Sequence, residues 1–128
     1  MLDVNPDIVC RLIMLAREFH AQEEVVFPET SGSPSGDWAG QILASHGDDM
    51  TFQEFRSIIR DLEPDQQQQV VALLWLGRGD YSVDEWEEIL EQTRDDWTAK
   101  TAEYLIAHPM LGDYLEEGLE LLDYHCDE

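Results

Sequence analysis

Seven consecutive apolar residues, Val-Val-Ala-Leu-Leu-Trp-Leu at 70–76, constrain this chain more than any other stretch. A helix that is apolar on every side has no face to offer water, so it belongs inside a packed domain. The stretch runs into Gly-Arg-Gly-Asp at 77–80, and glycine commonly ends a helix and turns the chain. We therefore predict a buried central helix over residues 64–77, with amphipathic helices packed around it.

Helix-start signals organise the chain before this segment. The Asn-Pro-Asp sequence at 5–7 combines a capping side chain, a proline suited to the first helical position and an acid favoured by the helix dipole. It predicts a helix that ends near Ala21. Thr51 with Glu54 matches a capping box, followed by apolar residues at helical spacing. This second helix should end where Pro64 opens the central one, because proline suits a first turn.

A second capping box, Ser82 with Glu85, opens the part of the chain after the central helix. Apolar residues follow at spacings of three, four and seven, which predicts one long helix to about Ala107, bent near Thr98. Trp86 and Trp97 belong to this apolar set and should face the core. The His-Pro sequence at 108–109 ends it.

The last helix should extend over about 110–122, with Met110 on its apolar side and Gly118 on the same face. A glycine inside a helix costs up to about 1 kcal/mol relative to alanine. We expect Gly118 to let a neighbouring helix come close. The tail at 124–128 carries no structural signal.

The fold class predicted from these patterns is all-α. No stretch alternates polar and apolar residues as a half-buried strand would. The chain should form one domain over 1–128, a bundle of about five helices around the central one. Gly, Pro and Ser residues at 28–40 predict a flexible loop, in which Trp38 either docks on the body or anchors a partner.

The charge balance is strongly acidic. Twenty-nine Asp and Glu oppose seven Lys and Arg, for a formal net charge of −22. Such a field repels nucleic acid and anionic membranes and attracts basic proteins or cations. We therefore expect no direct nucleic-acid or membrane partner, and a basic protein as the candidate partner. The acids can equally serve solubility alone, and homodimerisation through the last helices is a further option.

The two cysteines, Cys10 and Cys126, lie near opposite ends of the chain and match no metal-ligand or redox spacing. The N-terminus lacks the basic start and long apolar run of a signal peptide, and no apolar run approaches eighteen residues. We therefore expect a cytoplasmic protein with both thiols reduced.

Few residues are candidates for a functional site. No Ser or Cys stands in a local nucleophile signature, the four histidines are scattered, and there is no glycine-rich phosphate loop. We predict no catalytic residue, cofactor or metal ligand. The candidate binding residues are Trp38, Arg78 and Asp80, the last two at the turn after the central helix.

Three stretches together resemble a known family: Leu-Trp-Leu-Gly-Arg-Gly-Asp at 74–80, Thr-Ala-Glu-Tyr-Leu at 101–105 and Leu-Gly-Asp-Tyr-Leu-Glu-Glu-Gly-Leu at 111–119. The chain is similar to bacterial small acidic proteins catalogued as domain of unknown function 3775. The similarity covers 3–21 and then 51 to the C-terminus. It implies a bacterial, cytoplasmic protein, and it transfers no catalytic residue.

Three functional hypotheses follow. The first is a non-enzymatic protein-protein interaction module, favoured by the acidic field and the lack of catalytic groupings. The second is a small-ligand binder or enzyme with a pocket near residues 77–81. The third is an acidic mimic of nucleic acid, which requires acidic side chains in rows spaced like phosphates.

Overall fold

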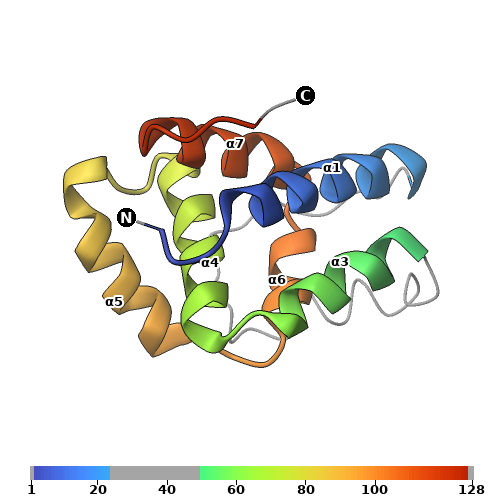
Figure 1. The fold of residues 1–128 in the computed structure, drawn as a ribbon, viewed down its shortest axis with the longest axis horizontal. Helices are drawn as coiled ribbons and strands as arrows, with labels where there is room; N and C mark the ends of the chain where they lie inside the picture. Colours follow the sequence, from blue (N-terminus) through green and yellow to red (C-terminus); the bar gives the residue numbers. More distant parts are fainter. Residues whose placement is uncertain (1, 24–49, 127–128) are drawn as a thin grey trace.

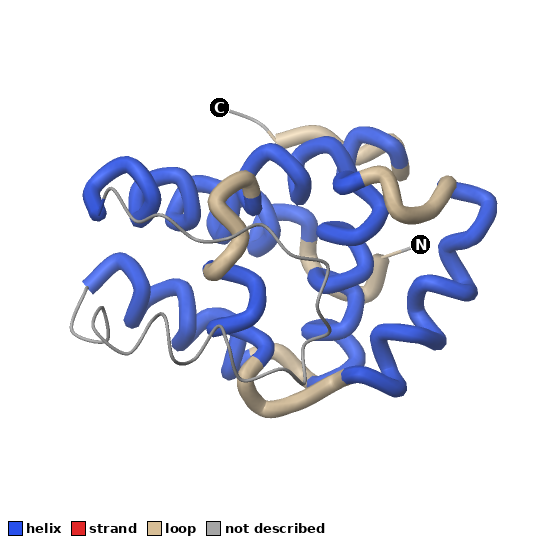
Figure 2. The backbone as a smooth tube through the Cα atoms, turned by 180° about the vertical axis from the view of Figure 1, so that it is seen from behind, coloured by secondary structure: helices blue, strands red, loops and turns tan. Residues whose placement is uncertain are grey.

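The computed structural model describes residues 2–23 and 50–126. Within them the chain forms six α-helices and a short 3₁₀ turn, and no strand, which confirms the all-α prediction (Figures 1 and 2). The elements are α1 (Pro6–Glu23), α3 (Met50–Asp61), α4 (Pro64–Arg78), η2 (Val83–Glu85), α5 (Trp86–Asp96), α6 (Thr101–Ile106) and α7 (Leu111–Leu121). The loop predicted at 28–40 and Trp38 lie outside the described residues.

Helix α4 is the centre of the fold, as the apolar run predicts. Every residue of 70–76 is buried. Figure 1 shows α4 between α5 on one side and α1 and α6 on the other, with α7 across the upper end of α4. Burying a Val, Leu or Ile side chain contributes roughly 1.5–3 kcal/mol. This helix therefore supplies much of the apolar core.

Helix α4 begins where predicted and ends at Arg78, one residue later than the first glycine. Pro64 takes the first position, and the Gln66 side chain accepts the Glu63 backbone N–H at 3.1 Å in a reciprocal cap. Gly77 is still helical, which corrects its predicted role as the stop. The cap is Gly79, whose φ of 92° is a left-handed conformation that suits glycine.

Gly77 instead allows α4 to touch α7. A Cβ atom added there would lie 1.7 Å from the Tyr114 carbonyl oxygen, and one added at Gly118 would lie 2.4 Å from the Leu73 carbonyl oxygen. The two backbones are thus in direct contact, with no room for a side chain. The prediction that Gly118 brings a neighbouring helix close is confirmed.

Helix α1 starts as its sequence predicts and ends at Glu23, two residues beyond the predicted end. The Asn5 side-chain oxygen caps it by accepting the Asp7 backbone N–H at 2.9 Å. The segment before it crosses α4, where the buried Gln69 amide oxygen accepts the backbone N–H groups of Asp3 and Val4 at 2.8 and 3.1 Å. The N-terminus is therefore tied to the central helix.

The predicted cap of α3 is wrong. Thr51 is already helical, because the described part of α3 begins at Met50. Glu54 does not reach back along its own helix but forms an ion pair with Arg11 of α1. The buried stripe of α3 is as predicted, with Phe52, Phe55 and Ile59 facing the core.

The long helix predicted to Ala107 is two helices, α5 and α6. The capping box of Ser82 and Glu85 is confirmed, although it opens the 3₁₀ turn η2 that leads into α5. The backbone adopts an extended conformation at Trp97. The indole N–H of Trp97 donates to the Gln67 side-chain oxygen of α4 at 2.8 Å. This contact holds the break between the helices open, so the predicted bend is a full interruption.

Two side chains are more exposed than expected. Trp97 is 37% exposed and Met110, at the start of α7, is 44% exposed, although both were predicted to face the core. Trp75 and Trp86 are buried as predicted.

Candidate functional site

Arg78 and Asp80, the two predicted binding residues that the structure describes, pair with each other. The Arg78 guanidinium donates to Oδ2 of Asp80 at 2.6 and 3.0 Å. Burial of the guanidinium lowers the pKa of Arg78, but the hydrogen bonds and charge of Asp80 outweigh it and the pKa is raised. Arg78 therefore stays a cation whose charge is already balanced.

Hydrogen bonds among buried polar side chains continue from this pair into the core. The Trp75 indole N–H donates to the Tyr104 hydroxyl at 3.0 Å, and Arg78 Nη1 lies 3.2 Å from His108 Nε2. His108 Nδ1 lies 2.9 Å from the Tyr104 carbonyl oxygen. A carbonyl can only accept, so Nδ1 carries the proton and Nε2 accepts from Arg78. Burial raises the pKa of the Tyr104 hydroxyl, against the opposing hydrogen bond from Trp75.

This Arg78 cluster, Arg78 with Asp80, Tyr104 and His108, joins the end of α4 to the end of α6. Its polar groups satisfy one another, as buried polar groups in folded proteins generally do. It contains no Ser or Cys nucleophile. The arrangement therefore acts as a structural brace between helices.

The outward side of η2 and α5 carries an acidic row, which we define as Asp84, Glu88, Glu91 and Asp95. Their spacings of four, three and four residues place them along one side of a helix, with neighbours about 5–6 Å apart. All four are exposed, and none takes part in the ion pairs found among the described residues. The charge of the row is thus left for solvent or a partner.

A groove of about 370 Å³ lies between α1 and α7. We call it the α1–α7 groove, and its lining residues are Asp7, Cys10, Arg11, Ile13, Met14, Arg17, Glu116 and Cys126. One end is closed by Arg17, which bonds Asp113 at 2.9 Å and Glu116 at 3.1 Å on α7. The hydrogen bonds that Arg17 donates to Asp113 and Glu116 raise the pKa of Arg17 in spite of partial burial.

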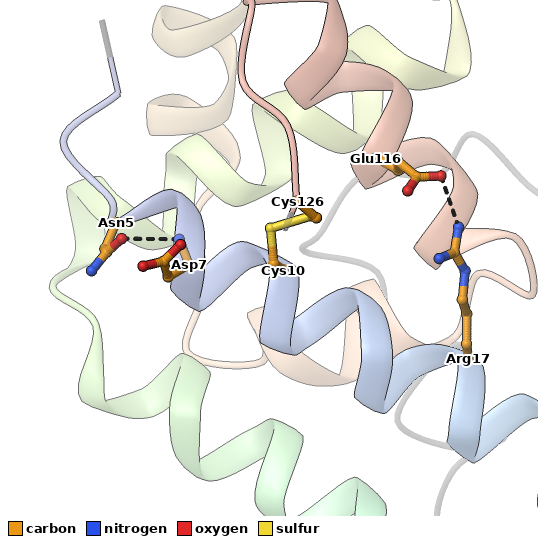
Figure 3. The surroundings of a disulfide bond; sticks show 6 residues. All are labelled: Asn5, Asp7, Cys10, Arg17, Glu116 and Cys126. Atoms are coloured by element: carbon orange, nitrogen blue, oxygen red, sulfur yellow. Dashed lines mark hydrogen bonds and ion pairs between the residues drawn. A yellow bond between two sulfur atoms is a disulfide. The ribbon is translucent and has the colours of Figure 1, made fainter. Parts of the chain in front are cut away.

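The other end of this groove is closed by a disulfide between Cys10 and Cys126 (Figure 3). Their Cα atoms lie 5.7 Å apart although 116 positions separate them in the chain. This finding corrects the prediction of two reduced thiols. Residues 124–126 form no helix or strand, and the bond fastens Cys126 to α1.

Two further pockets border α3. One of about 570 Å³ lies between α1 and α3, and one of about 340 Å³ is lined by Gln53, Arg56, Ser57, Arg60 and Asp61. Neither includes residues 77–81. Across residues 2–23 and 50–126, no group of three or more His, Cys, Asp or Glu side chains could hold a metal ion. In the same part of the chain no helix has the length and apolar character needed to cross a membrane.

Two features of the surface were missed in the sequence. The acidic row could have been found from the four-three-four spacing of its acids, a pattern that we did not single out in the sequence. The disulfide had a weaker signal, the presence of two cysteines and no others. Trp38, the third predicted binding residue, lies outside the described residues.

Comparison with known proteins gives one match. The model of a family described as a protein of unknown function, DUF3775, matches residues 52–124, more than half of the chain. The match covers α4 to α7 and most of α3, and leaves α1 outside it. No curated protein and no solved structure matches.

Proposed function

The chain belongs to the DUF3775 family, and because the description of that family names no activity, we propose a function from the surface itself. The protein is a non-enzymatic interaction module that binds a basic protein through the acidic row. The observation that carries this proposal is the position of the row on the outward side of η2 and α5, unpaired in a chain of net charge −22.

The geometry supports binding by charge at this place. Helix α5 packs against α4 through buried Trp86, Ile89 and Thr93, and its other side faces outward at one edge of the molecule (Figure 1). A surface of one sign speeds the encounter with an oppositely charged partner, and this effect falls as salt rises. Trp97, partly exposed at the end of α5, adds an aromatic contact of the kind enriched in interfaces.

We place the protein in the bacterial cytoplasm, as the sequence resemblance implies. In the cytoplasm the Cys10–Cys126 disulfide has to persist in a reducing environment, where proteins rarely keep structural disulfides. Cell fractionation tests this placement separately from binding, and recovery of the protein outside the cytoplasm would contradict it.

Affinity capture from the native cell at low and high salt, with identification by mass spectrometry, tests the binding proposal. The bait is compared with the variant E88Q/E91Q/D95N, which removes three charges from the row. The matched control E117Q/E120Q/D123N removes three exposed charges from α7 and the residues after it. We expect a basic protein that is retained by the wild type and the control, lost from the row variant and released at high salt. Equal capture by all three baits would refute a role for the row.

The nucleic-acid mimic is the second candidate, and the regular spacing of the row favours it. A mimic occupies the DNA site of its partner, so duplex DNA should compete with the protein for the captured protein. Capture that is unaffected by excess DNA would exclude the mimic and leave the interaction module.

The remaining hypotheses stay predictions. A ligand pocket near 77–81 would have to form beside an Arg78 side chain already engaged by Asp80 and His108. A homodimer through the last helices would show as twice the monomer mass in analytical ultracentrifugation.

A further inference from the structure

The Cys10–Cys126 disulfide stands where a dissolved thiol can reach it. Both cysteines are half-buried, not sealed in the core, and both line the α1–α7 groove. Thiol–disulfide exchange requires an attacking thiolate to approach a sulfur atom, so access is the first condition for reactivity. The groove supplies that access along the side of α1.

The bond holds a short segment after α7 that also packs against the core through Leu122 and Tyr124. Helix α7 ends at Leu121, and the chain reverses at Asp123, a residue other than glycine with a φ of 69°. The Tyr124 backbone N–H then donates to the Leu119 carbonyl oxygen at 2.9 Å, and the Tyr124 hydroxyl accepts the Leu2 backbone N–H at 3.4 Å. Asp123 and His125 are exposed. We call residues 122–126 the C-terminal strap.

The contacts that hold the central helix α4 in place do not involve the disulfide. The contact of α4 with α7 is made by Gly77 and Gly118 and by buried side chains of 70–76, none of which touches the groove. Arg17 links α1 to α7 independently of the cysteines. Opening the disulfide therefore releases the strap without removing any of the contacts that hold α4 in place.

We propose that Cys10 and Cys126 form a thiol–disulfide exchange site that a dithiol reductant opens and a disulfide oxidant closes. In the opening reaction, a thiolate of the reductant attacks one sulfur of the protein disulfide and forms a mixed disulfide. The cysteine that leaves takes up a proton. The second thiol of the reductant then displaces the other cysteine, so the protein gains two electrons and two protons and the reductant becomes a disulfide.

The consequence is a change in the α1–α7 groove. With Cys126 released, the strap no longer closes the end of the groove beside Asp7, and the side of α1 that carries Cys10 and Met14 becomes more accessible. This inference does not depend on the acidic row, which lies on the other side of α4.

Equilibration of the full-length protein in buffers of reduced and oxidised dithiothreitol at graded ratios, followed by quenching with a maleimide and mass analysis, tests the site. We expect two labels to appear together within the series, on protein that stays folded by circular dichroism. Hydrogen–deuterium exchange should rise most in 122–126 and in the first turns of α1, while 70–76 stays protected. The variant C10S/C126S should show the released exchange pattern at every ratio.

Two results would overturn the proposal. Protein that takes up label only after a denaturant is added would identify a purely structural bond. Loss of protection in 70–76 when the bond opens, in the reduced protein or in C10S/C126S, would mean that reduction unfolds the domain and does not release a local segment.

Discussion

Helices α7 and α5 both pack against the central helix α4, but they differ in their contacts with it and in the surface that they expose. Helix α7 meets α4 backbone to backbone at Gly118, and α1, the Arg17 ion pairs and the strap cover part of its remaining surface. Helix α5 meets α4 through a few buried side chains, and its other side offers the acidic row to solvent.

From this difference we infer that the α7 side serves stability and the α5 side serves binding. The α7 side contains the closest contact between helices, two ion pairs and the covalent link, so changes there should cost folding free energy. The α5 side contains like charges at helical spacing, which repel one another, so changes there should cost little stability. The following predictions test this separation from the largest expected effect to the smallest.

Gly77→Ala should have the largest effect. The added methyl would lie 1.7 Å from the Tyr114 carbonyl oxygen, and a backbone atom cannot move aside as the end of a flexible side chain can. We expect a loss of more than about 3 kcal/mol or a failure to fold, measured by urea denaturation. The control is Gly79→Ala, which meets no atom within 4 Å and should cost about 1–2 kcal/mol through its positive φ. Similar costs for the two variants would contradict a tight α4–α7 contact.

Cys10→Ser should come next. The disulfide closes a loop across 116 positions, and loss of such a link commonly costs about 2–5 kcal/mol, mostly by freeing the unfolded chain. Thermal and urea unfolding under oxidising conditions measure the difference. Addition of a reductant should lower the stability of the wild type and leave that of the variant unchanged. A variant as stable as the oxidised wild type would show that the bond does not contribute to folding.

His20 should make stability depend on pH. Burial lowers the pKa of its ring below the ordinary value of 6.5, and the backbone hydrogen bonds with His108 and Ile106, which raise the pKa, only partly oppose this. The unfolded chain therefore binds the proton more readily, and stability should fall as pH drops through 6.5, by at most about 1.4 kcal/mol per pH unit. His20→Gln should remove this part of the pH dependence between pH 7 and 5.5. An unchanged slope would assign it to other groups.

Neutralising the acidic row should change stability least. The variant E88Q/E91Q/D95N removes repulsion between neighbouring acids, each pair worth roughly 0.2–0.5 kcal/mol, so we expect a gain of less than about 1 kcal/mol. Urea denaturation at low salt measures it. A large loss of stability would mean that these acids serve the fold, and the contrast between α5 and α7 would disappear.

The sequence predicted the parts of the fold that depend on local pattern. The apolar run at 70–76 fixed the buried helix, and Gly118 indicated the close contact with it. The break at Trp97 was not predictable as an interruption, because its cause is Gln67, thirty positions away. Which of Gly77 and Gly79 ends α4 also depends on a neighbour, since α7 requires Gly77 inside the helix.

The candidate sites were harder to predict for the same reason. Arg78 and Asp80 were chosen from their place after the central helix, and their pairing with each other reduces what they can offer a ligand. Cys10 and Cys126 meet only because α1 runs antiparallel to α7 and the chain reverses after α7. Neither the packing of α1 against α7 nor the reversal of the chain after α7 can be predicted from a local sequence pattern.

Hydrogen–deuterium exchange of the protein alone and in complex with its captured partner tests most directly whether the α5 side is the binding side. The proposed function predicts slower exchange in residues 84–96 on binding and no change in 111–126. Slower exchange confined to α1, α7 and the strap would place the partner on the side that we assign to stability and would contradict the account.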